Sequence, residues 1–109
     1  MAMSWEEYMR RWEDYHPILP TLSKIMDKYS DLVNGYNSHP QDVQYTLFGH
    51  VVISVIKTEY GVVFEADVNI RFDDEPKTPI LPKRIIELLE ELRENRGRII
   101  AEAQQILKY

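Results

Sequence analysis

Residues 43–73 read VQYTLFGHVVISVIKTEYGVVFEADVNIRFD and carry the clearest structural signal of the chain. From Val62 to Asp73 apolar and polar side chains alternate, which is the period of a β-strand with one face in a core. A second apolar run precedes a short break at residues 58–61. Folding back at this break sets apolar residues or glycine opposite one another: Val55 and Phe64, Ile53 and Ala66, Val51 and Val68, Gly49 and Ile70, Leu47 and Phe72. This stretch therefore predicts one long antiparallel β-hairpin.

The other face of the predicted hairpin is apolar on only one of its strands. Phe48, Val52 and Ile56 point to that face, whereas the opposite strand presents mainly polar residues there. An apolar strand face is normally covered, and two strands alone make an unstable sheet. The pattern indicates no third strand elsewhere in the chain, so we expect a second copy to supply the cover. The alternative is that the protein's own helices cover both faces of the hairpin.

Two helices are predicted before the hairpin. Ser4 and Glu7 fit a capping box, and an aromatic stripe with helical spacing follows, with Trp5, Tyr8 and Trp12 as its heaviest members. We expect most of this stripe in the core, with some of it facing a partner, because Trp and Tyr are common interface anchors. Thr21 is expected to cap the second helix, which ends at Asn34–Gly35. The stretch 35–42 is interpreted as a loop.

One long helix is predicted after the hairpin, from Pro82 to Leu107. Gly97 interrupts it, so either another backbone approaches closely there or the helix bends. The predicted fold class is therefore α+β: two N-terminal helices, one long antiparallel hairpin and one long C-terminal helix. The length of 109 residues fits one domain, which we place at residues 3–109, with residues 1–2 as an expression leader.

Composition excludes several classes of protein. There is no cysteine, hence no disulfide or thiolate site, and no apolar run approaches the length of a membrane span, so a cytoplasmic protein without a membrane role is expected. The net charge of −5 is concentrated in residues 41–81, which sum to −4. That balance disfavours nucleic acid, because phosphate contacts need a basic face. The basic residues of the last helix alternate with glutamates, which is typical of a solvated helix face.

Catalytic, metal and cofactor signatures are missing from the sequence. The acidic run Asp73–Asp74–Glu75 lacks the alternating ligands and the glycine of a calcium loop, so no metal site is predicted. The register places His50 near Glu65 and Asp67 on the outer face of the hairpin, which leaves a small enzyme or ligand-binding protein as the alternative. We favour a non-catalytic protein-interaction module, such as a small adaptor, assembly factor or inhibitor, that forms a homodimer and needs no cofactor. Its candidate interface residues are Trp5, Tyr8, Trp12, Phe48, Val52 and Ile56.

Overall fold

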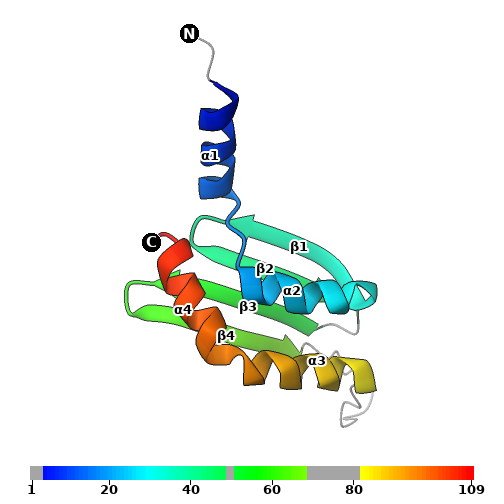
Figure 1. Ribbon diagram of the computed structural model, residues 1–109. Coiled ribbons are helices and arrows are strands. Elements are labelled where there is room, and N and C mark those ends of the chain that lie inside the picture. The colour runs from blue at the N-terminus through cyan, green and yellow to red at the C-terminus, as the bar shows by residue number, and fades with distance from the viewer. Residues whose placement is uncertain (1–3, 49–50, 69–81) are drawn as a thin grey trace, which may run out of the picture.

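The computed structural model describes residues 4–48, 51–68 and 82–109. In these residues four α-helices accompany one antiparallel sheet (Figure 1). The helices are α1 (Trp5–Tyr15), α2 (Pro20–Lys28), α3 (Lys83–Glu94) and α4 (Arg96–Ile106), with a short 3-10 turn, η1 (Ser30–Leu32), after α2. The strands are β1 (Val33–His39), β2 (Asp42–Leu47), β3 (Val51–Thr58) and β4 (Gly61–Val68), which lie side by side in chain order.

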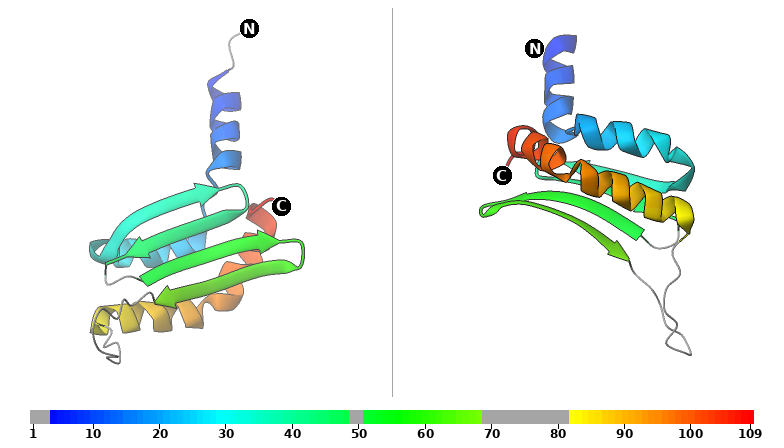
Figure 2. Two further views of the ribbon diagram at one scale, coloured as in Figure 1. Left: turned by 180° about the vertical axis from the view of Figure 1, so that it is seen from behind. Right: turned by 60° about the horizontal axis from the view of Figure 1, so that its bottom comes forward.

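The body of the molecule has two layers. Helices α2, α3 and α4 cover one face of the sheet, and no described element covers the other, which we call the open face (Figure 2). The core lies between the layers, and its members among the described residues are Leu19, Leu22, Ile25, Met26, Val43, Leu47, Val51, Ile53, Val55, Ile85, Leu88, Leu92, Ile99, Ala103 and Leu107. Alternation along β2 and β3 and helical spacing along α2 and α3 place these side chains on the facing surfaces.

The predicted register between β3 and β4 is confirmed. Val55 pairs with Phe64, Ile53 with Ala66 and Val51 with Val68. The chain turns back at Glu59–Tyr60 and enters β4 at Gly61, whose φ of 131° is accessible to glycine and costly for other residues. The predicted pair of Gly49 with Ile70 lies outside the described residues.

The predicted order of elements is wrong, although the α+β class is confirmed. The long first strand is in fact two strands, because the chain reverses after Leu47 and Leu47 pairs with Val51 in place of Phe72. The stretch 35–42, interpreted as a loop, forms most of β1 and its turn at residues 40–41. The sequence of β1, VNGYNSH, is poor in β-branched residues, so pairing with β2 decides its conformation.

The C-terminal helix bends, as one of the two readings of Gly97 predicted. Residues 83–106 form α3 and α4, which meet at Asn95. The side chain of Asn95 donates a hydrogen bond to the carbonyl oxygen of Glu91 at 2.9 Å and so competes with the helical backbone pattern. Apart from the neighbouring residues of its own helix, no described atom lies within 4 Å of a methyl group built on Gly97, so no other described segment approaches its backbone closely.

The start of α2 differs from the prediction. The N-cap is Leu19, which offers no side-chain hydrogen bond, and Thr21 lies inside the first turn. Glu102 of α4 replaces the cap: its two carboxylate oxygens accept from the Thr21 backbone N–H at 3.1 Å and from the Thr21 hydroxyl at 2.7 Å. A carboxylate at a helix N-terminus is also favoured by the helix dipole.

Candidate functional site

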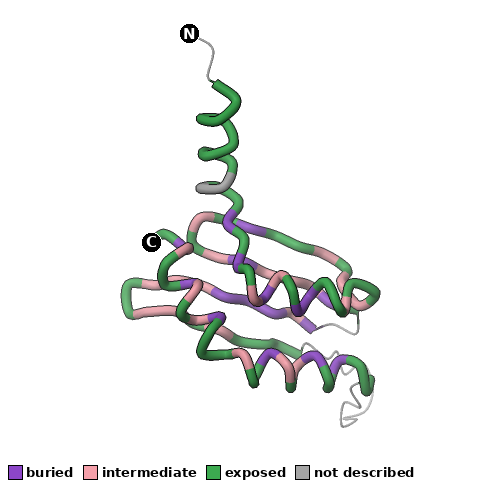
Figure 3. Tube along the Cα trace, viewed as in Figure 1, coloured by how far each residue is buried: buried purple, intermediate pink, exposed green. Residues whose placement is uncertain are grey.

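Helix α1 stands away from the body of the molecule (Figure 1). The molecule measures 60 × 27 × 26 Å, and the long dimension includes this projecting helix. Every described side chain of α1 is exposed (Figure 3), and the aromatic stripe contributes nothing to the core. The expectation that most of the stripe is core was therefore wrong. Its aromatic residues are open to contact from outside the chain.

Local interactions give α1 its helical form. The Ser4 hydroxyl oxygen accepts a hydrogen bond from the Glu7 backbone N–H at 3.2 Å, as the capping box predicted, and Glu6 and Glu7 lie favourably at the positive end of the helix dipole. Inside the stripe, the Trp5 and Tyr8 rings are stacked with centroids 5.7 Å apart. A helix of 11 residues is nevertheless marginal in water without tertiary packing. Contact with a partner would supply that packing.

The root of α1 is fixed to the sheet, so the helix projects from a defined point. Pro17 and Leu19 are buried, and the Pro17 carbonyl oxygen accepts hydrogen bonds from the Ser38 hydroxyl at 2.8 Å and the Tyr36 hydroxyl at 3.4 Å. Above this anchor the His16 backbone N–H caps the helix by donating to the Trp12 carbonyl oxygen. Pro17, two residues after the end of α1, thus positions the helix on the sheet.

Two hollows lie on and beside α1. The first, which we call the α1 hollow, is lined by Tyr8, Arg11, Trp12, Tyr15 and His16. The second, the root groove, lies where α1 meets the body, and Trp12, His16, Ile18, Tyr36, Asn37, Ser38 and His39 line it. Sequence reasoning identified neither hollow. The root groove joins residues of α1, its linker and β1, and β1 itself was not predicted.

The six predicted interface residues do not form one surface. Trp5, Tyr8 and Trp12 lie on α1, whereas Phe48 lies just after β2, exposed, and Val52 and Ile56 on β3 are half-buried. Cross-strand pairing places Val52 between Thr46 and Asp67 on the open face of the sheet and Ile56 between Asp42 and Val63. The intervening row of Asn37, Gln44, Ser54 and Glu65 is polar. The open face therefore has two small apolar patches, at Val52 and at Ile56, separated by polar residues. The apolar residues of α1 form one continuous patch.

The alternative catalytic group is only partly described. His50 lies outside the described residues, and Glu65 and Asp67 are both exposed on β4, one of the two outer strands of the described sheet. The acidic run at residues 73–75 also lies outside them. Across residues 4–48, 51–68 and 82–109, no group of three or more His, Asp or Glu side chains is placed to hold a metal ion.

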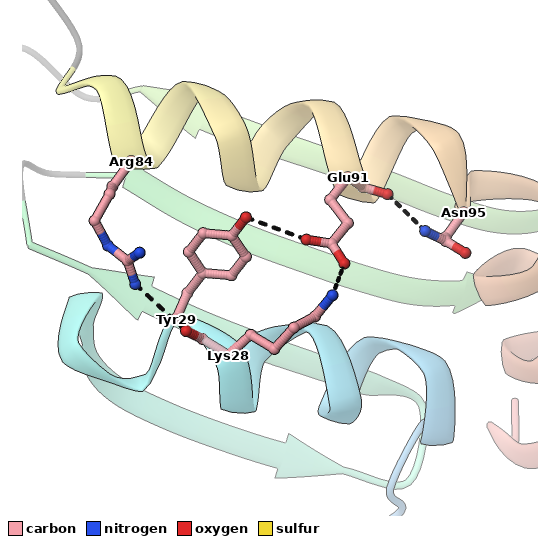
Figure 4. A network of polar contacts seen from close by, with 5 residues as sticks. All are labelled: Lys28, Tyr29, Arg84, Glu91 and Asn95. Carbon is pink, nitrogen blue, oxygen red and sulfur yellow. Dashed lines mark hydrogen bonds and ion pairs between the residues drawn. The ribbon is translucent and has the colours of Figure 1, made fainter.

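A polar network joins α2 to α3 on the surface of the body (Figure 4). The Glu91 carboxylate pairs with the Lys28 ammonium group and accepts a hydrogen bond from the Tyr29 hydroxyl at 3.1 Å. The bond from Lys28 lowers the pKa of the Glu91 carboxyl. Arg84 donates to Asp31 at 2.6 Å and lies 4.9 Å from the centre of the Tyr29 ring. The charged residues of the last predicted helix were interpreted as a solvated face. Two of them, Glu91 and Arg84, instead bind residues at the end of α2 and just after it.

Comparisons with known proteins leave the geometry as the sole guide to function. The chain matches no protein-family model, no curated protein and no solved structure at a significant level. Among the helices that the structure describes, none has the length and apolar character needed to cross a bilayer.

Proposed function

We propose that the protein is a non-catalytic protein-interaction module that acts as a homo-oligomer through α1. One observation carries the proposal: an aromatic helix projects from a packed body and buries none of its stripe against that body. Trp5, Tyr8, Trp12 and Tyr15 are each about half exposed or more. Exposed apolar surface gathered on one element is typical of an interaction site, and aromatic residues are the usual anchors of such sites.

The body supports this role because none of its described core residues comes from α1. The core draws its residues from the α1–α2 linker, α2, the sheet, α3, α4 and the residue after α4, and none of them comes from α1. Changes on α1 therefore alter association and leave the core in place. The arrangement also explains how one small chain can present a binding helix on a rigid support: the Pro17 anchor sets the direction in which α1 leaves the sheet.

The test is the mass of the full chain in solution. Sedimentation velocity on the wild type at high micromolar concentration should give a mass above the 13.0 kDa of one chain. The double change Trp5→Ser and Trp12→Ser should shift the protein toward the monomer with an unchanged thermal transition. Tyr60→Ser is the matched control, since Tyr60 is 92% exposed at the β3–β4 turn, far from α1 in the chain. A wild type that stays at 13.0 kDa overturns the proposal.

A further inference from the structure

The outer edge of β4, together with the flank of α3 beside it, has the features of a site for an added strand. We propose that an extended segment of another protein binds there and pairs with β4 as a fifth strand. The segment carries apolar side chains toward the helices, lysines toward the open face and an acid beside Arg93 and Arg96. This site is separate from α1, so it goes beyond the proposed function and does not depend on it.

The backbone of β4 is unpaired on its outer side within the described residues, because β4 is the last strand of the described sheet. The Lys57 backbone N–H donates to the Gln41 carbonyl oxygen at 2.8 Å and therefore faces away from β4, so Lys57 and its partner Val62 are not hydrogen-bonded to each other. Bonded and non-bonded pairs alternate along antiparallel strands. Val62, Phe64 and Ala66 therefore direct their N–H and C=O groups away from β3, toward a further strand.

The two outer strands of the described sheet differ in how their edges are protected. Natural edge strands avoid pairing with other chains through bulges, prolines, lysines or a covering segment. In β1 the register shifts between Val33 and Gly35. The linker between α1 and α2 is bonded to the same strand, since the Ser38 hydroxyl donates to the Pro17 carbonyl oxygen. β4 keeps one register throughout Gly61–Val68 and contains no proline or lysine, so it is the edge that can accept a partner strand.

The side of β4 that faces the helices is incompletely covered. Val55 of β3 is fully buried, whereas its partner Phe64 on β4 is only half-buried. Ile53 is likewise buried, and its partner Ala66 is exposed. A hollow of about 230 Å³, the β4 hollow, lies beside them where α3 runs alongside β4 (Figure 1), and its lining consists of Phe64, Glu65, Ala66, Leu89, Leu92, Arg93 and Arg96. Pockets for small molecules measure about 300–1,000 Å³, so the β4 hollow suits side chains of a strand better than a free ligand.

The charges around this edge define the composition of the added strand. Arg93 and Arg96 line the β4 hollow, and neither guanidinium group forms an ion pair with a described residue. Glu65 also borders the hollow, but strand alternation directs its side chain and that of Asp67 to the open face. A partner strand is therefore complementary if it carries an acid on the helix side and lysines on the open face. A second copy fits poorly, because its β4 would add two more acids to the open face.

The direction of the added strand follows from the position of the arginines. α3 runs antiparallel to β4 (Figure 1), so its last turn, with Arg93, lies toward the Val62 end of β4. An antiparallel fifth strand, the more stable arrangement, runs from the Val68 end to the Val62 end. Its C-terminal residue then lies near Arg93 and Arg96, and we place the acid there.

A designed peptide tests this site on the full chain. The matched probe is a heptapeptide with an N-terminal fluorophore and an amidated C-terminus, Val-Lys-Ile-Lys-Val-Thr-Glu, whose lysines face Asp67 and Glu65 in the antiparallel register. Fluorescence anisotropy should show saturable binding with a Kd below about 1 mM. The charge-reversed probe Val-Glu-Ile-Glu-Val-Thr-Lys retains the alternation and should bind at least tenfold more weakly. Absence of saturation by the matched probe, or equal binding of both probes, overturns the proposal.

Two variants of the protein locate the binding. Ala66→Pro removes an outward N–H and should abolish binding with an unchanged thermal transition, because proline is tolerated on an edge strand when its missing N–H faces outward. Arg96→Glu retains the strand and should weaken binding of the matched probe about fivefold. Arg98→Glu is the matched control, because it makes the same change of charge beside α2 and away from the β4 hollow. Equal effects of Arg96→Glu and Arg98→Glu would refute the assigned position of the acid.

Hydrogen exchange distinguishes strand addition from other contacts and other occupants. The backbone N–H groups of Phe64 and Ala66 should exchange at least tenfold more slowly when the matched probe is bound, whereas that of Glu65, which faces β3, should change little. If Phe64 and Ala66 are already protected without the probe, the edge is paired in the free protein and the proposal is wrong. A lower mass of free Ala66→Pro in sedimentation velocity would identify a second copy as the occupant and would also overturn it.

Discussion

Replacing Glu102 with alanine should remove the side-chain cap of α2 and destabilise the body measurably. In the structure the Glu102 carboxylate accepts from the backbone N–H and from the hydroxyl of Thr21, at 3.1 and 2.7 Å. Hydrogen bonds to a charged group contribute about 1.5–3 kcal/mol, and loss of an N-cap costs about 1 kcal/mol. Because the site is only part-buried and water can replace some of the lost bonds, we expect a loss of about 2 kcal/mol in the free energy of unfolding.

The measurement is urea unfolding followed by far-UV circular dichroism. Tryptophan fluorescence would not report on the body, because Trp5 and Trp12 both lie on the projecting α1. Glu102→Gln retains one acceptor and loses the charge, so it should cost about half as much. Glu94→Ala, an exposed glutamate of α3, is the matched control and should change stability by less than about 0.5 kcal/mol. If Glu102→Ala falls within that range too, the capping interaction proposed between α4 and α2 is refuted.

Three further changes test the backbone and the core. Gly97→Ala should stabilise the protein by about 0.5–1 kcal/mol in urea unfolding, since the position is helical with free space around it, and destabilisation would show that Gly97 is needed for the bend. Gly61→Ala should instead cost about 1 kcal/mol or more because φ there is 131°, and a neutral result would contradict that turn geometry. Burial raises the pKa of Tyr45 to about 12, above the ordinary value near 10. The neutral Tyr45 hydroxyl therefore makes its full contribution to the free energy of unfolding below about pH 10. That contribution is lost as the pH rises through about 12, and the loss is at most about 2 kcal/mol. Tyr45→Phe should flatten the stability profile over that range, and an unchanged slope would refute the assignment.

The sequence alone predicted those elements whose formation depends on residues close together in the chain. The alternation from Val62 onward set the β3–β4 register, because a slip of one residue would turn every apolar side chain of the strand toward water. Ser4 and Glu7 marked the start of α1, since capping depends only on neighbours in the chain. The helical spacing of Ile85, Leu88 and Leu92 likewise predicted a buried helix face.

Long-range contacts decided the rest. β1 has no strand signal of its own and exists because β2 offers it a hydrogen-bonding edge, and the Tyr36 ring lies 4.7 Å from that of Tyr45. The cap of α2 comes from Glu102, 81 residues away from Thr21, and no local pattern could assign it. The exposure of α1 could not be predicted from the sequence either, because an aromatic stripe has the same spacing whether it packs in a core or faces a partner. Only the tertiary structure shows that the body fills its core without those side chains, because burial depends on which surfaces meet in space.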